Sequence, residues 1–175
     1  MKIALCFSGQ PRFVNECSAL IKNNVIQDYD IDVFAHLWFD DDLQTKPYKY
    51  GGDSDWENQR IKGTAIDDFV NTYNPREMLV EPSKSFGDPD LDEDFELSEA
   101  KYWPGGIEGQ PDFQKRQINN SLSYFYSLCE ANRLRKLYEY ENKVRYDYVI
   151  RCRTDSQIHQ PVRYENYNPD HIHFT

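Results

Sequence analysis

Short apolar runs and stretches of helical periodicity alternate along this chain. The runs at 3–7 and 30–38 are apolar at most positions, which is typical of strands covered on both faces. Between them a helix is predicted over about 13–27, where four apolar residues recur at helical spacing: Phe13, Cys17, Leu20 and Ile21.

The same alternation continues after a polar, turn-rich excursion at 40–62. Thr64 and Asp67 have the form of a capping box, although Glu or Gln is the usual partner. The helix that they introduce has one apolar stripe, formed by Ile66, Phe69, Val70 and Tyr73. A short strand is predicted at 78–80 and ends before Pro82.

A long helix and a fourth strand complete the pattern. The helix is predicted over about 113–142, and the first half of its apolar face is a narrow stripe of Ile118, Leu122, Phe125 and Cys129. The fourth strand covers 146–155. Short pieces at 158–162 and 171–174 are candidates for further strands.

Strands that alternate with helices imply right-handed crossovers and a mainly parallel sheet. We therefore predict an α/β fold, with a Rossmann-like sheet and helices on both faces. The chain of 175 residues fits a single domain over 1–175. The acidic connection at 83–111 is predicted to be a mobile loop, because connections of this length are uncommon inside compact domains.

Composition and charge narrow the classes of function. Aromatic residues make up 15% of the chain, which argues against disorder, and the net charge of −10 excludes a broad contact with nucleic acid. No apolar run reaches the length of a membrane span, and the segment after Met1 and Lys2 is too short for a signal-peptide core. A cytoplasmic location is therefore expected. The cysteines are predicted to be buried free thiols: Cys6, Cys17, Cys129 and Cys152.

Ligands of parallel α/β sheets bind beyond the carboxyl ends of the strands. This rule selects three segments: Ser8–Arg12, His36–Asp42 and Arg151–Ser156. In the first, Gly9 allows a sharp turn, the next helix offers N–H groups to phosphate, and Arg12 can bind a diphosphate in a bidentate manner. The alternative is a plain turn whose arginine pairs with a neighbouring carboxylate.

Charged residues gather at the end of the fourth predicted strand. Alternation puts Arg151, Arg153 and Asp155 on one side of an otherwise buried strand. Because unpaired buried charges are costly, this side either opens into a wet crevice or carries charges that neutralise one another. Asp155 is then a candidate metal ligand and Arg153 a contact for the same anion. The structural alternative is an Arg–Asp ladder that only fixes the next loop.

The second predicted strand supplies weaker candidates. His36 is either a hydrogen-bonded core residue or a base, and Trp38 either stacks on a ligand ring or packs in the core. Asp40–Asp42 either supply oxygens to a metal or form a solvated loop. The sequence has no P-loop, no Gly-x-Gly-x-x-Gly fingerprint and no Gly-x-Ser-x-Gly elbow, and no catalytic residue is assigned.

Three stretches together resemble a known family: LCFSGQPRF at 5–13, DVFAHLW at 32–38 and YDYVIRCRTD at 146–155. In order and spacing they are similar to the GT-A-like glycosyltransferase domains of large algal viruses, marine phages and some bacteria. For a viral member of such a family, the expected location is the host cytoplasm.

The resemblance implies a nucleotide-diphospho-sugar donor, a glycan or glycoprotein acceptor, and Mn²⁺ or Mg²⁺ held by an Asp-x-Asp-type motif. Asp155 lies where that motif usually lies, but Arg153-Thr154-Asp155 replaces two carboxylates. Without a metal, Arg12 and Arg153 would stabilise the leaving diphosphate. The candidate nucleotide-sugar-binding residues are Phe7, Ser8, Gly9, Gln10, Arg12, His36, Trp38, Arg153 and Asp155.

We therefore expect a glycosyltransferase. The first alternative is a non-catalytic nucleotide-sugar-binding or assembly module, which the missing carboxylate and the short region after Asp155 suggest. Another nucleotide-using α/β enzyme, such as a nucleotidyltransferase or a kinase-like protein, is a third possibility. The short C-terminal region is expected either in an N-terminal fragment or in a minimal version without a full acceptor site.

Overall fold

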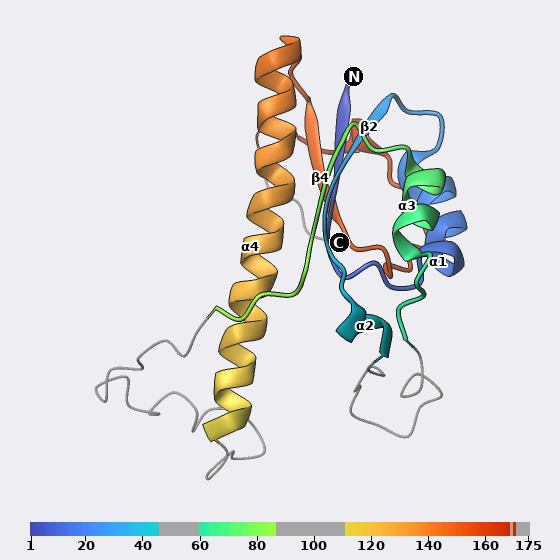
Figure 1. The fold of residues 1–175 in the computed structure, drawn as a ribbon. Coiled ribbons are helices and arrows are strands. Elements are labelled where there is room, and N and C mark those ends of the chain that lie inside the picture. Colours follow the sequence, from blue (N-terminus) through green and yellow to red (C-terminus); the bar gives the residue numbers. More distant parts are fainter. Residues whose placement is uncertain (46–59, 87–110, 169, 171–175) are drawn as a thin grey trace, which may run out of the picture. The chain divides into compact units, whose positions relative to one another are not determined.

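A computed structural model describes residues 1–45, 60–86, 111–168 and 170 (Figure 1). The elements follow one another as β1 (Ile3–Gly9), α1 (Val14–Ile21), η1 (Lys22–Ile26), β2 (Ile31–Trp38), α2 (Asp41–Thr45), α3 (Ala65–Tyr73), β3 (Glu77–Glu81), α4 (Pro111–Asn142), β4 (Tyr148–Cys152) and η4 (Tyr164–Asn166). The acidic run of the predicted loop and the candidate strand at 171–174 lie outside the described residues.

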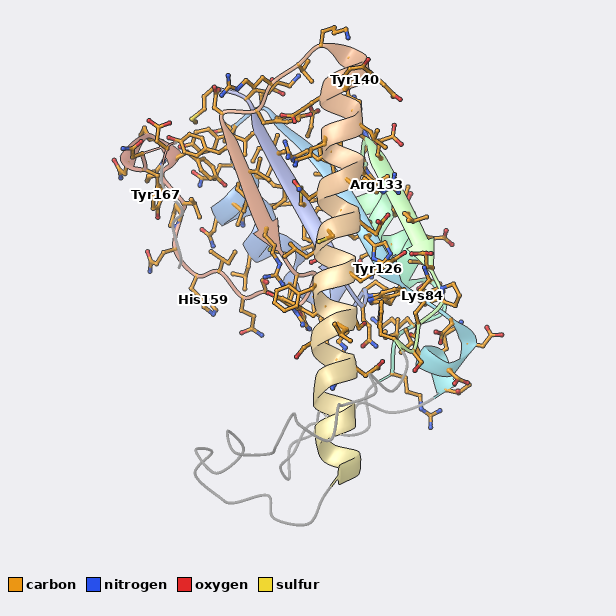
Figure 2. The ribbon with its side chains drawn as sticks, turned by 90° about the vertical axis from the view of Figure 1, so that its left-hand side faces the viewer. Lys84, Tyr126, Arg133, Tyr140, His159 and Tyr167 are labelled. Carbon is orange, nitrogen blue, oxygen red and sulfur yellow. The ribbon has the colours of Figure 1, made fainter. Side chains whose placement is uncertain are left out.

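By its internal packing the chain divides into two compact units. One comprises Met1–Ser83 with Ser127–Thr175, and the other comprises Lys84–Tyr126. In the second unit the Lys84 ammonium donates a hydrogen bond of 2.8 Å to the Tyr126 hydroxyl (Figure 2). The sheet and the candidate site belong to the first unit.

The sheet has four parallel strands in the order β3-β2-β1-β4. The central strand β1 pairs with β2 from Ile3 to Gly9 and with β4 from Ile3 to Phe7. The chain runs outward from β1 through β2 to β3 and then crosses back to β4 on the other side of β1. The strand order therefore reverses between β1 and β4, and the predicted α/β fold with a mainly parallel sheet is confirmed.

Helices cover both faces of this sheet. α1 and α3 pack on one face, and the part of α4 from Ser127 onward packs on the other (Figure 1). The first face holds the larger core, which includes Leu5, Phe7, Val33, Ala35, Leu37, Phe69 and Tyr73. The second core is smaller and comprises Ala4, Cys6, Phe34, Ala131 and Tyr146. Burial on both faces explains why β1 and β2 lack a polar alternation.

The segment after β4, residues 156–168, forms a C-terminal strap instead of the strand predicted at 158–162. Its backbone bonds to a helical turn: Asn24 Nδ2 donates to the Ile158 carbonyl, and the Val162 N–H donates to the Asn24 carbonyl, both at 2.7 Å. Asn24 lies in η1, a π-helical turn that extends α1. The strand prediction is wrong because these polar groups pair with a helix turn and not with a strand. Figure 2 marks the strap with two labelled residues, His159 and Tyr167.

The predicted capping box before α3 is also wrong. The Thr64 hydroxyl lies 3.0 Å from a carboxylate oxygen of Asp68 and makes no cap to a backbone N–H. The short side chain of Asp67 therefore has no capping role, and α3 is fixed by burial of Ala65, Phe69 and Tyr73.

From Leu122 onward, the apolar stripe that predicted the buried face of α4 lies on the exposed side of the helix. Phe125 is 57% exposed, and Leu122 and Cys129 are exposed as well, so the predicted burial of Cys129 is wrong. The side of α4 that meets the sheet carries Ser127 and Ala131. Small and polar residues give little hydrophobic signal, which is why the periodicity selected the wrong face.

A buried carboxylate near the amino end of β2 contacts residues from three other segments of the chain. Asp32 is 2% exposed and accepts hydrogen bonds from Arg76 Nε at 2.6 Å and from the Tyr146 hydroxyl at 2.7 Å, while Lys2 Nζ lies 3.4 Å away. Burial raises the pKa of Asp32, but the hydrogen bonds from Tyr146 and Arg76 and the charges of Arg76 and Lys2 outweigh it, so the pKa is lowered. The ionised carboxylate therefore stabilises the folded chain.

Replacing Asp32 with Asn should lower the free energy of unfolding by about 2 kcal/mol at pH 7, because hydrogen bonds to charged groups contribute about 1.5–3 kcal/mol. The folded-state pKa lies below the usual 3.8, so this contribution is complete above that value and is lost as the pH falls through the folded pKa. The difference between wild type and D32N should therefore be full near neutral pH and should shrink as the pH falls below about 3.8.

Urea unfolding followed by circular dichroism measures this difference at each pH. Asp30→Asn is the matched control, because Asp30 is exposed and lies just before β2. A difference that stays constant in acid would contradict the assigned role of the Asp32 charge.

Candidate functional site

The carboxyl ends of β1 and β4 meet where the strand order reverses. The buried Thr154 hydroxyl donates a hydrogen bond of 3.2 Å to the Gln10 carbonyl. Since Phe7 pairs with Cys152, the two strands also end at a similar level. Ligands of open α/β sheets bind in the crevice at such reversal points. Two of the three predicted segments therefore lie together at the favoured place.

The segment after β1 turns sharply into a short basic link. Gly9 has a φ of +108°, which side-chain-bearing residues rarely adopt. The Arg12 side chain lies along Gln10, with Arg12 Nε donating to the Gln10 side-chain oxygen at 2.8 Å. α1 begins at Val14, so its first N–H groups and the positive end of its dipole follow this link directly.

The segment after β4 forms a turn around an ion pair. Arg153 donates from Nε and from Nη2 to the two oxygens of Asp155, each at 2.7 Å. The Arg153 side chain is 43% exposed and that of Asp155 is 14% exposed. β4 ends at Cys152, three residues before the predicted end, so these two residues neutralise one another in a turn at the surface.

A second guanidinium adds to the positive charge of this edge. Arg151 is exposed on β4, and its pKa is lowered, first by partial burial and then by the nearby charge of Arg153. The end of β4 therefore carries two guanidinium groups close together, one of which pairs with Asp155.

A cavity opens beside the link that follows β1. Its cavity volume is about 40 Å³, and it is lined by Pro11 and Phe13, by Arg60–Lys62 and by the first turns of α1 and α3. Lys62 Nζ lies 2.9 Å from Glu16 Oε1, and this hydrogen bond lowers the pKa of Glu16. Pockets that enclose small ligands are larger, roughly 300–1,000 Å³, so this cavity is a shallow hollow in the surface.

A buried hydrogen-bond chain joins α4 to the sheet behind β1. His36 Nδ1 lies 2.8 Å from Ser127 Oγ, and His36 Nε2 lies 2.9 Å from Glu81 Oε2. The Gly9 N–H donates to the same Ser127 oxygen at 2.8 Å. Ser127 is only 1% exposed, so this set differs from the accessible nucleophile of a hydrolase. In this structure His36 is a hydrogen-bonded core residue.

Three further candidates have buried side chains. Phe7 packs against the aromatic rings of α3, Trp38 packs edge-on against the His36 ring, and Ser8 lies opposite His36 in the sheet. Their side chains therefore contribute to the interior of the site and not to its surface. The candidates that remain at the convergence are Gln10, Arg12, Arg153 and Asp155, with Gly9 shaping the turn.

The residues around Asp155 do not fit a divalent metal. Both carboxylate oxygens already accept hydrogen bonds from a cation, Arg153. Among the described residues no group of three or more His, Cys, Asp or Glu side chains is arranged to hold a metal. Asp40, in the candidate segment His36–Asp42, accepts hydrogen bonds from the N–H groups of Leu43 and Ser83 at 2.8 Å each. This part of the chain therefore gives no support to the predicted Mn²⁺ or Mg²⁺.

Sequence reasoning missed Ser127, Glu81 and the cavity residues around Arg60. Ser127 lies inside a long helix, where a serine carries no signal of its own. Glu81 is the last residue of β3, so the strand-end rule that selected the other segments would have selected it too. The residues at 60–62 fall in the polar excursion and follow no periodicity.

Comparison with protein-family models, with curated proteins and with solved structures gives no match. No helix in the described ranges combines the length and the apolar character that a membrane span requires. The family resemblance of the three stretches therefore stays a prediction, and the fold class rests on the observed strand order.

Replacing Ser127 with Ala removes the hydroxyl that bridges Gly9 and His36. We expect the free energy of unfolding to fall by about 2–3 kcal/mol, because each buried polar group left without its partner costs about 1–3 kcal/mol. Urea unfolding measures the change. Ser123→Ala, one turn earlier on α4, is the control and should change stability by less than about 0.5 kcal/mol. Equal stabilities of S127A and wild type would show that these hydrogen bonds do not hold α4 to the sheet.

Proposed function

We propose that this chain is a glycosyltransferase domain that binds a nucleotide-diphospho-sugar beyond the carboxyl ends of β1 and β4. The observation that carries the proposal is the convergence of the two segments through the Thr154–Gln10 hydrogen bond. This bond joins two of the three stretches whose sequence resembles the glycosyltransferase family, at the strand ends where α/β sheets bind nucleotides.

The charges of these segments suit a diphosphate. A chain with a net charge of −10 repels anions overall, so an anionic ligand needs local cations. Arg12 follows β1 and Arg153 follows β4. A guanidinium can form bidentate hydrogen bonds to phosphate oxygens. The N-terminus of α1 adds N–H donors and a positive dipole end beside Arg12.

The hollow beside the β1 link is too small to enclose a nucleoside, but its wall offers a surface against which a base can lie. It adjoins the β1 link through Pro11 and Phe13, and its wall combines the apolar Phe13 and Ile61 with the cationic Arg60. A base needs apolar surface together with a few polar groups for orientation. In this proposal the base of a nucleotide-sugar lies against that wall, and its diphosphate lies at the segments that carry Arg12 and Arg153.

Arginines at the diphosphate would also promote the reaction. The acceptor hydroxyl attacks the anomeric carbon, the bond from that carbon to the phosphate oxygen breaks, and the diphosphate leaves with the electron pair. Negative charge grows on the leaving group in the transition state, where fixed guanidinium groups stabilise it. The proton of the acceptor passes to a general base.

Replacing Arg12 with Ala should weaken the binding of UDP-sugars or GDP-sugars by about tenfold or more, because a lost hydrogen bond to a charged group corresponds to at least this factor. Isothermal titration of both sugar classes measures the affinity. Arg145→Ala is the matched control, because Arg145 is exposed and lies just before the amino end of β4, away from the carboxyl ends of the strands. Unchanged affinity in R12A, or a preference of the wild type for ATP, would contradict the proposal.

The second candidate function is a nucleotide-sugar-binding module without turnover. It is favoured because three carboxylates at the strand ends already have partners within the protein. Asp155 pairs with Arg153, Asp40 accepts backbone N–H groups, and Glu81 pairs with His36. A general base must be within reach of the acceptor hydroxyl. Saturable binding with no release of free nucleoside diphosphate, in the presence of a panel of sugar acceptors, would favour the module over the enzyme.

A further inference from the structure

We infer that the Arg153–Asp155 pair is an anion-binding element that works without a divalent metal: Arg153 contacts the diphosphate, and Asp155 is a positioning residue that holds its guanidinium. The identity of the ligand as a nucleotide-sugar rests on the proposed function. The chemistry of the pair requires only a pyrophosphate group.

The geometry of the ion pair assigns the two roles. Asp155 takes two of the five N–H donors of the guanidinium, at Nε and Nη2. The Arg153 side chain is 43% exposed, so part of the same planar group is accessible to an anion from the solvent side. Because its orientation is already fixed by Asp155, less conformational freedom is lost when the anion binds.

A metal at Asp155 would meet three obstacles. It would have to displace or face the guanidinium of Arg153, which occupies both oxygens at 2.7 Å. It would also be repelled by the charge of the exposed Arg151, whose pKa is lowered by partial burial and then by the nearby charge of Arg153. Mg²⁺ and Mn²⁺ prefer several oxygen ligands, and the described residues provide no group of three acidic, histidine or cysteine side chains for one.

The turn that carries the pair is held from several sides. Its backbone is fixed by β4 and by the hydrogen bond from the Arg153 N–H to Ser156 Oγ at 3.2 Å. The Thr154 hydroxyl bonds to the Gln10 carbonyl, which places the pair beside the β1 link. The preorganised guanidinium of Arg153 therefore belongs to the residue next to the one that contacts the β1 link.

The first experiment uses inorganic pyrophosphate in EDTA. Arg153→Met should weaken its binding by about tenfold or more in isothermal titration, and Arg153→Lys should give an intermediate loss, since lysine keeps the charge but loses the planar fork. Arg145→Met is the charge-matched control and should bind like the wild type. Equal affinities of R153M and R145M would overturn the inference.

The second experiment separates a positioning carboxylate from a metal ligand. The affinity for a UDP-sugar or GDP-sugar, whichever binds more tightly, is measured with Mn²⁺ and with EDTA in wild type and Asp155→Asn. We expect the affinities with Mn²⁺ and with EDTA to differ by less than about twofold in both proteins, because no metal contributes to binding. A metal contact would change the affinity by about tenfold, which corresponds to 1.4 kcal/mol. A gain of tenfold or more from Mn²⁺ that disappears in D155N would overturn the inference.

A spectroscopic measurement tests the positioning role directly. The ¹⁵Nε–¹H signal of Arg153 should be protected from solvent exchange in the wild type and should exchange rapidly in D155N, because Asp155 is the acceptor of that proton. Equal exchange in both proteins would show that Asp155 does not hold the guanidinium.

The outcomes distinguish this inference from the proposed function. Pyrophosphate binding that depends on Arg153, without binding of any sugar nucleotide, would support the inference and reject the proposed function. Sugar-nucleotide binding that requires both Mn²⁺ and Asp155 would support the function and reject the inference. A chain that binds neither ligand would reject both.

Discussion

The hydrogen bond from the Thr154 hydroxyl to the Gln10 carbonyl joins the two segments that carry the candidate ligand contacts. It forms at the one place in the sheet where the strand order reverses, between β1 and β4. The crossover from β3 back to β4 is what brings Arg153 close to a link that lies more than a hundred residues earlier. Without that reversal, the segments that carry Arg12 and Arg153 would not meet.

The two faces of the sheet differ in the polarity of the groups that they bury. The α1 and α3 face holds the larger apolar core and opens at its edge into the cavity beside Pro11. The α4 face carries buried polar groups on β2, with Asp32 near one end and His36 near the other. Each is satisfied by partners from distant segments, Tyr146 for Asp32 and Ser127 for His36. These contacts fix the strand ends from which the candidate site extends.

An acidic chain with a few clustered cations has a defined electrostatic character. Its overall charge of −10 disfavours nonspecific binding of anions, so affinity depends on local geometry. Arg153 is both paired and partly exposed, and this combination limits its conformational freedom without burying its charge. A guanidinium held in this way can provide positive charge at a diphosphate. In many reactions of phosphate compounds, a metal ion provides that charge.

The sequence by itself determined the parallel α/β class, because burial of β1 and β2 on both faces removes polar alternation, and it nominated Arg12, Arg153 and Asp155 through their place at strand ends. Only the tertiary structure decided that Phe7, His36 and Trp38 are interior and that Asp155 pairs with Arg153. The apolar stripe of α4 and the strand at 158–162 were wrong for the same reason. Periodicity is a local property, whereas burial and hydrogen-bond partners depend on residues far apart in the chain, such as Gly9 and Ser127.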